Sequence, residues 1–260
     1  MRPWLLSIHF AAAIAAASPL QAIAYTMTPS QVTLLPSGGG ASTFLRLENK
    51  EARPAAVEIT VQEHRKDLDG KTLQGAPADE DFIVYPAQIV MLPGDEVAVQ
   101  VRWIGAAPLA AERAYTLVAR EVPIPRPAQE PDPAGGVRLD IRVQVNYEAR
   151  IYVTPAGAKP RVVVESVAER SADSTSPAAG PQLEIILANE GTAHQALTDL
   201  TLRVVPLDPA GVPLRQQAVS IPAREVPAMR PHLLAGQRRR LLVPRPAGLP
   251  AGPVQVLLSP

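Results

Sequence analysis

The side chains that could perform chemistry in this sequence are few, and their spacing does not favour catalysis. The four histidines are at positions 9, 64, 194 and 232, and no two of them have the short spacing of a metal-ligand pair. The sequence has no cysteine, which excludes thiol catalysis, cysteine-ligated zinc and disulfide bonds. It has neither a Gly-x-Ser-x-Gly motif nor a glycine-rich phosphate loop followed by a helix. We therefore predict a protein that is not an enzyme and that uses no metal and no cofactor.

Three other short segments of unusual composition have simple structural interpretations. Gly38 to Gly40 lies between two predicted strands, so we expect a turn there. Asp79 to Asp81 is interpreted as a solvated acidic loop rather than a cation site. Arg238 to Arg240 is expected to be the exposed face of a strand. The formal net charge is zero, so the sequence gives no electrostatic support for nucleic acid as a partner.

The segment with the clearest recognition chemistry is 139–146, continued by 147–155 up to Pro155. Apolar and polar residues alternate along it, and on a strand such alternation places one apolar row and one polar row on opposite faces. The row could be ordinary sandwich core, which periodicity alone favours, or it could be offered with a free strand edge to another protein. Arg150 follows the row and could hold a carboxylate, although its charge alone favours a solvated surface residue or a salt bridge at the rim of the core. The apolar row consists of Leu139, Ile141, Val143 and Val145.

The elements around this segment are predicted to be short strands. The sequence is rich in proline, with 29 residues, and poor in aromatic residues, which favours strands separated by turns over a helical bundle. Residues 25–35 are expected to be extended, and short alternating runs follow without a good helix between them, which is typical of an antiparallel immunoglobulin-type sandwich. The runs are 43–48, 56–62, 82–85, 88–92, 96–103 and 115–122. A second, smaller β set is predicted at 161–165, 182–188, 197–207, 216–221, 238–243 and 254–258, with no close internal repeat.

The N-terminus predicts export. Residues 5–17 form an apolar run, and Ala22 and Ala24 are the small residues that a signal peptidase recognises. The run is too short for a membrane span and no basic stop signal follows it, so we expect no stable membrane insertion. We predict a signal peptide at 1–24, a first domain at 25–155 and, after a short linker that begins at Ala156, a second domain at 156–260.

In the order and spacing of its short motifs, the sequence resembles the PapD-like periplasmic chaperones of chaperone–usher pilus assembly. The resemblance implies an all-β protein with two immunoglobulin-like β-sandwich domains in tandem, set at an angle. It also implies that the protein has no enzymatic activity. The matching segments are Tyr85-Pro86, Leu92-Pro-Gly94, Val99-Gln-Val-Arg102, Arg120-Glu-Val-Pro123 and Leu233-Leu-Ala-Gly236 followed by Arg238 to Arg240.

The resemblance also implies a function and its residues. A periplasmic chaperone of this kind stabilises pilus or fimbrial subunits by donor-strand complementation and delivers them to an outer-membrane usher, and its donor row would be residues 139–145. Arg150 would anchor the subunit's C-terminal carboxylate. Gln31 stands where the family has a second basic anchor residue, and Thr154 stands where the family favours arginine before the closing proline.

The alternative function is an exported structural or adhesive protein built from two β-sandwiches. A polymerising pilin would need its own N-terminal donor extension and an incomplete sandwich, whereas the first half of this chain has a full set of predicted strands. Self-association of the protein through the edge of its donor strand is a further possibility for its partners.

Overall fold

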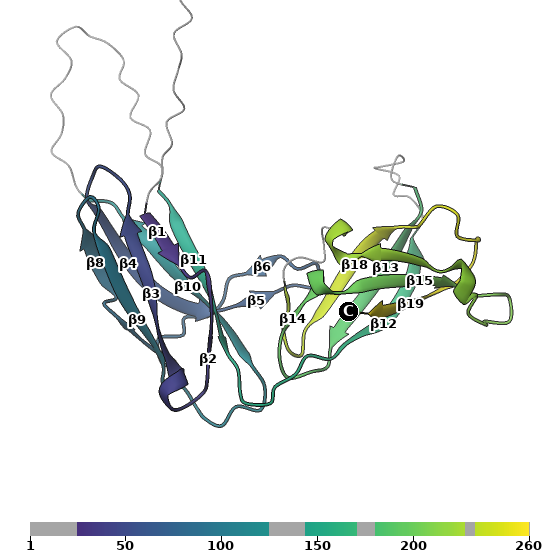
Figure 1. Cartoon of the computed structure of the whole chain (residues 1–260), viewed down its shortest axis with the longest axis horizontal. Coiled ribbons are helices and arrows are strands. Elements are labelled where there is room, and N and C mark those ends of the chain that lie inside the picture. The colour runs from purple at the N-terminus through teal and green to yellow at the C-terminus, as the bar shows by residue number, and fades with distance from the viewer. Residues whose placement is uncertain (1–24, 125–143, 171–179, 227–231, 260) are drawn as a thin grey trace, which may run out of the picture.

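The computed structural model describes residues 25–124, 144–170, 180–226 and 232–259. Its regular structure consists of strands and short 3-10 turns, arranged as two sandwiches that are set at an angle to each other (Figure 1). Each sandwich encloses its own cluster of buried apolar residues. The predicted fold class, two immunoglobulin-like β-sandwich domains at an angle, is confirmed.

The first sandwich consists of two sheets that share the N-terminal segment. Residues 25–35 were expected to form one extended stretch, but Pro29 and Ser30 divide it into two strands that join different sheets. The sheet with the order β1-β3-β9-β7 contains Tyr25–Thr28, Ser42–Asn49, Glu96–Trp103 and Phe82–Tyr85. The sheet with the order β2-β11-β10-β4-β8 contains Gln31–Leu34, Asn146–Val153, Arg113–Val122, Ala55–Glu63 and Gln88–Met91.

The pairing in the first sandwich follows the prediction with one exception. Neighbouring strands in both of its sheets are antiparallel, except that β11 and β2 are parallel. The inward rows are those that the alternation predicted: Leu45 and Leu47 on β3 and Val99 and Val101 on β9 are fully buried. The predicted turn at Gly38 to Gly40 is confirmed, since Gly38 caps the 3-10 turn η1 (Gly39–Ala41), which contains the other two glycines.

The second sandwich is smaller. One sheet has the order β12-β13-β18, the other has the order β16-β15-β19, and β14 pairs with β17. The predicted strand at 197–207 is shorter than expected, because the 3-10 turn η3 (Leu197–Asp199) precedes β15. The strands are β12 Val162–Arg170, β13 Gln182–Asn189, β14 Gln195–Ala196, β15 Thr201–Pro206, β16 Val219–Pro222, β17 His232–Leu233, β18 Arg238–Pro244 and β19 Val254–Ser259, with 3-10 turns η4 Arg215–Gln217 and η5 Ala223–Glu225.

The expectation that Arg238 to Arg240 form an exposed strand face is wrong for Arg239. This residue is only 1% exposed, because on β18 it shares the inward parity of Leu241 and Val243. At the start of the strand that inward face meets a hairpin of the first sandwich, β5 Arg65–Lys66 and β6 Thr72–Leu73, rather than solvent. A long guanidinium side chain fills this space and donates to the carbonyl of His232 (3.3 Å).

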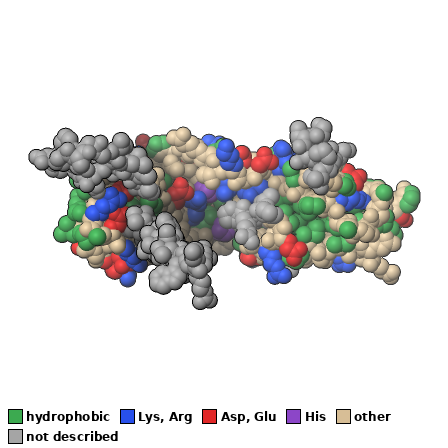
Figure 2. Space-filling model, turned by 90° about the horizontal axis from the view of Figure 1, so that it is seen from above, with side chains coloured by type: hydrophobic (Ala, Val, Ile, Leu, Met, Phe, Trp, Pro, Cys, Tyr) green, Lys and Arg blue, Asp and Glu red, His purple; other side chains and the backbone are tan. Residues whose placement is uncertain are grey.

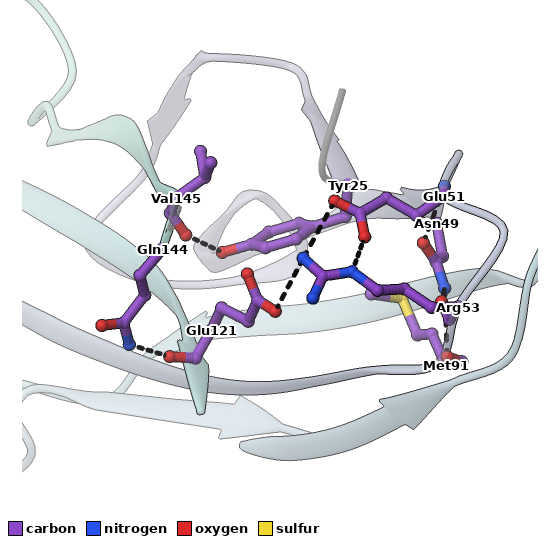
Figure 3. Close-up of polar contacts among 8 residues, drawn as sticks. All are labelled: Tyr25, Asn49, Glu51, Arg53, Met91, Glu121, Gln144 and Val145. Carbon is purple, nitrogen blue, oxygen red and sulfur yellow. Dashed lines mark hydrogen bonds and ion pairs between the residues drawn. The ribbon is translucent and has the colours of Figure 1, made fainter. Parts of the chain in front are cut away.

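The two sandwiches repeat one local arrangement that the sequence did not reveal. Asn49 ends β3, and its buried amide donates to the backbone carbonyls of Arg53 (2.9 Å) and Met91 (3.1 Å) (Figure 3). Asn189 ends β13, and its buried amide donates to the carbonyls of Ala193 (2.8 Å) and Leu233 (3.1 Å). In both cases a side chain satisfies loop carbonyls that the strands leave unpaired.

A glycine turn completes each of these arrangements. The amides of Gly94 and Gly236 donate to the backbone carbonyls of Asn49 and Asn189, each at 2.9 Å. Both glycines have positive φ, +83° and +70°, a conformation that other L-residues rarely adopt. The two turns therefore need both the asparagine and the glycine, although the surrounding sequences differ.

We predict that Asn49→Ala destabilises the first sandwich by about 2–4 kcal/mol, because it leaves buried carbonyl groups without a donor. Urea unfolding followed by the fluorescence of Trp103, the only tryptophan after residue 24, measures the loss. Asn146→Ala is the matched control, since Asn146 is exposed. Equal midpoints for Asn49→Ala and Asn146→Ala would contradict the proposed role of Asn49.

Candidate functional site

Strand β11 is paired along its full length on one side and along half of its length on the other. It pairs with β10 from Asn146 to Val153, but with β2 only from Arg150 to Val153. Among the described residues, no strand pairs with residues 146–149 on the β2 side. The first half of β11 is therefore a free edge, which is a template for an additional strand.

The direction of the backbone groups on this edge follows from the pairing. The amides of Arg150 and Thr154 donate toward the β2 side, to the carbonyls of Ser30 (2.9 Å) and Leu34 (2.8 Å). Asn146 and Glu148 have the same parity as Arg150, and residues of one parity direct their backbone N–H and C=O groups to the same side of a strand. The backbone groups of Asn146 and Glu148 therefore face the free edge.

The predicted donor row lies mostly outside the described residues. This holds for Leu139, Ile141 and Val143, so the structure neither supports nor contradicts their role. Val145 is described, and the strand that was expected to run from residue 139 through 146 begins, where it is described, at Asn146, so that Val145 directly precedes it.

Val145 contacts its own domain. Its side chain is partly buried against the first core, and its carbonyl accepts a hydrogen bond from the hydroxyl of Tyr25 (3.3 Å) (Figure 3). The neighbouring Gln144 side chain donates to the carbonyl of Glu121. Val145 also shares the parity of Ala149 and Ile151, which are fully buried. At this end of the row, the packing is that of an ordinary core strand.

Arg150 and Gln31 are direct partners in the β11–β2 register. The Arg150 side chain is 26% exposed, and its Nη1 donates to the Thr116 hydroxyl (3.1 Å) and to the Glu148 carboxylate (3.0 Å). Within the described part of the chain, no acceptor bonds to its Nε or Nη2. Arg150 can therefore present two further donor nitrogens, Nε and Nη2, to a carboxylate, in the fork geometry that guanidinium groups use for this purpose. Gln31 adds no charge beside it.

A buried histidine supports Arg150 from behind. Thr116, which accepts from Arg150, also bonds to Nδ1 of His64 (3.1 Å), and His64 is 5% exposed. Burial, together with the positive charge of Arg150, lowers the pKa of His64 to about 4, so its ring is neutral at pH 7. The sequence does not indicate this role, because a single histidine has no spacing signal.

A buried carboxylate joins the two sandwiches beside this site. Oε1 of Glu112 accepts a hydrogen bond from the backbone amide of His194 (3.1 Å) and lies 2.7 Å from its Nδ1. Thr154, at the position where the resemblance implies arginine, donates its hydroxyl to Oε2 of Glu112 (2.8 Å). The departure at residue 154 thus has a structural explanation, because Thr154 binds the junction carboxylate.

Two aromatic contacts complete the junction. Tyr152 stacks on the His194 ring with 3.9 Å between centroids, and its hydroxyl lies 3.1 Å from Nδ1 of His232. Burial, and secondarily the charge of Glu112, raises the pKa of Tyr152 to about 12. Burial also lowers the pKa of His232, and His194 contributes. Figure 2 shows histidine and basic side chains gathered in the concave region between the two sandwiches.

This junction could not be predicted from the sequence. Its residues come from segments about 80 positions apart, so no local pattern brings them together. Within the described residues, no group of three or more potential ligands is arranged to hold a metal ion, and no helix is long and apolar enough to cross a membrane. The chemistry available here is the pairing of backbone groups and the binding of an anion.

A family model described as "Pili and flagellar-assembly chaperone, PapD N-terminal domain" matches residues 26–159, just over half of the 260 residues. The chain belongs to this family of pilus-assembly chaperones. The family consists of chaperones rather than enzymes, and the match spans both halves of the β2–β11 pair, so the free edge and Arg150 lie inside the matched region. A search of curated proteins gave no match.

Solved structures of fimbrial chaperones share the two-domain fold. The class 5 fimbriae chaperone CfaA has a TM-score of 0.54 and 13% identity over 90% of this chain and 98% of its own. A structure described as a chaperone–tip adhesin complex of CFA/I fimbriae biogenesis scores 0.55, with 13% identity over 90% and 97%. The Salmonella enterica SafA pilin–SafB chaperone complex scores 0.50, with 16% identity over 85% and 84%. At these identities the similarity establishes the fold.

We predict a specific pH dependence for His64. Its folded pKa is lowered from 6.5 to about 4, so between these values the unfolded chain binds a proton that the folded protein excludes. The contribution of neutral His64 to the free energy of unfolding is therefore complete above pH 6.5 and is lost as the pH falls toward 4. This loss amounts to at most about 3 kcal/mol. His64→Gln removes this loss.

Urea unfolding of the wild type and of His64→Gln at pH 7 and pH 4.5 measures this pH-dependent loss of stability. The stability difference between wild type and His64→Gln should shrink or reverse at pH 4.5, and this comparison cancels the contribution of His232. Parallel pH profiles of the two proteins would show that His64 is not the titrating group.

Proposed function

We propose that this protein is a periplasmic chaperone that binds pilus or fimbrial subunits by donor-strand complementation and delivers them to an outer-membrane usher. The observation that carries the proposal is the free edge of β11 at residues 146–149, directly beside Arg150. An incomplete subunit sandwich needs one further strand, and such an edge supplies backbone hydrogen-bonding groups in a fixed register.

The donor row extends this edge in the proposal. Leu139, Ile141, Val143 and Val145 fill the hydrophobic groove that a subunit exposes when it lacks a strand. Each buried Val, Ile or Leu side chain contributes about 1.5–3 kcal/mol, so four of them give a strong apolar anchor. The contact of Val145 with the chaperone's own core supports a dual role, in which this residue fixes the end of the row.

Arg150 fixes the register of the bound subunit in the proposal. The subunit's C-terminal carboxylate binds the guanidinium in the concave region between the sandwiches. The unused donors of Arg150 and its partial exposure support this role. Neutral His64 and Thr116 hold the guanidinium in place without competing for its charge.

The remaining parts of the proposal concern compartment and organisation. Residues 1–24 direct the chain to the periplasm and are removed, residues 25–155 form the strand-donating domain, and residues 156–260 form the second domain. Binding requires no nucleotide. Two chaperone molecules can associate through the same edge of β11 when no subunit is present.

The proposal predicts that a pilin-like subunit from the same genome accumulates in the periplasm only when it is co-expressed with this protein. The two proteins should co-purify in a one-to-one complex. The measurement is the amount of soluble subunit with and without the chaperone. A subunit that accumulates equally well in both cases would contradict the proposal.

We predict that Val145→Asp reduces subunit retention strongly, because it places an unpaired charge in an apolar contact. Gln144→Ala, at the exposed neighbouring position, should retain the subunit nearly as well as wild type. Thermal unfolding of the free variants is the control. If Val145→Asp unfolds without a subunit, the row is needed only for the chaperone's own core at this position.

We predict that Arg150→Ala lowers subunit affinity by about 3–5 kcal/mol, at least about a hundredfold, because the bound carboxylate loses its partner. The chaperone should remain folded, since Arg150 is partly exposed. A subunit with a C-terminal extension should lose affinity in the same way. Wild-type affinity for Arg150→Ala would show that strand complementation acts without a carboxylate anchor.

A further inference from the structure

The β5–β6 hairpin connects the proposed anchor region with the second sandwich. It follows His64, whose ring is linked through Thr116 to Arg150. At the tip of the hairpin, the carbonyl of Leu68 accepts a hydrogen bond from the backbone amide of Arg240 on β18 (2.7 Å). The hairpin is therefore held at both ends, between the two sandwiches (Figure 1).

Lys66 is the half-buried cation of this hairpin. Its ammonium donates to the carbonyl of Gly70 (3.2 Å), and among the described residues no carboxylate forms an ion pair with it. Lys66 comes two residues after His64, whose ring shares the Thr116 hydroxyl with Arg150, and the turn to which Lys66 bonds packs against Arg239. Burial, with the charges of Arg239 and Arg150, lowers the pKa of Lys66, and the charge of Asp67 acts in the opposite direction. A site of this kind favours an anion that relieves the repulsion between the cationic groups.

Lys66 is the cation in this group that a ligand can share with Arg150. Arg239 is 1% exposed and packs against Gly70, where the guanidinium lies in the space that a Cβ atom would need. This contact holds the turn that Lys66 bonds to, so the buried arginine positions the hairpin. The Lys66 side chain is only partly buried and has donors that the Gly70 carbonyl does not use.

We propose that Lys66 is the second basic group of the carboxylate site, in place of the basic residue that the neutral Gln31 does not supply. The inference rests on the proposed function, because it concerns the same carboxylate that Arg150 binds. A carboxylate with its two oxygens shared between a guanidinium and an ammonium is held in position and orientation. The second charge thus comes from the β5–β6 hairpin rather than from the first strand.

The test uses a synthetic peptide of alternating valine and threonine, prepared with a free C-terminal carboxylate and as the amide. Affinities are measured by fluorescence anisotropy for the wild type, Lys66→Met, Arg150→Ala and the double variant Lys66→Met with Gln31→Arg. Lys71→Met is the matched control, since its side chain is exposed on the same hairpin and only its backbone amide and carbonyl bond to Asp67.

The wild type should prefer the free acid. Lys66→Met should bind the free acid at least about tenfold more weakly than the wild type does, as expected for the loss of one charge-assisted hydrogen bond. It should bind the amide as well as the wild type does. Lys71→Met should behave like the wild type. In the double variant, Gln31→Arg should restore the preference for the free acid by placing a cation beside Arg150. This restoration separates a lost charge from a misfolded hairpin.

Two other results overturn the inference in different ways. If Lys66→Met keeps the whole preference for the free acid while Arg150→Ala loses it, the proposed anchor stands and Lys66 has no part in it. If the wild type does not discriminate between acid and amide, no carboxylate site exists, and both the inference and the anchor role of Arg150 fail.

Discussion

The parallel pairing of β2 with the second half of β11 is the constraint on which the rest of the structure depends. It fixes Gln31 opposite Arg150 and stops before residues 146–149, so one strand serves two purposes. Its second half is an interior strand with fully buried Ile151 and Val153, and its first half has no partner on the β2 side among the described strands. A strand paired on both sides throughout would stabilise the sandwich further, but it would leave no backbone groups for a partner.

The junction between the sandwiches depends on polar contacts that are satisfied within the protein. The buried carboxylate of Glu112 is bonded from both sides, by Thr154 and by His194, and a buried charge is tolerated only with such partners. These contacts hold the first sandwich, at Glu112 and Thr154, against the second sandwich at His194. Within the described residues, Lys66 forms no ion pair and Arg150 has donors that Thr116 and Glu148 do not use, which suits the binding of an anion.

The sequence predicted the strands well because their signal is local. Alternation alone gives β4, β9 and β13 nearly to the residue, and the turn that begins at Gly38 follows from glycine chemistry. The division of residues 25–34 between two sheets could not be predicted, because either half alternates equally well. The parallel β11–β2 pair was hidden for the same reason, since alternation does not give the direction of a partner strand.

The candidate site was predictable only in part. Arg150 was found because it follows an apolar row and matches a family position, and its partner Gln31 was found from the same match. Glu112, Tyr152 and His194 were missed, since each is an ordinary residue until the fold brings distant segments together. Arg239 was assigned to the surface because a run of arginines is usually solvated, whereas here the hairpin covers its side chain.

The central claim is that a subunit pairs with the free edge of β11, and amide hydrogen exchange tests it most directly. The amides of Asn146 and Glu148, which face that edge, should exchange quickly in the free chaperone and become protected when a subunit binds. The amides of β8, the opposite edge of the same sheet, should exchange at the same rate in both states. Protection at β8 with unchanged exchange at Asn146 and Glu148 would contradict the account.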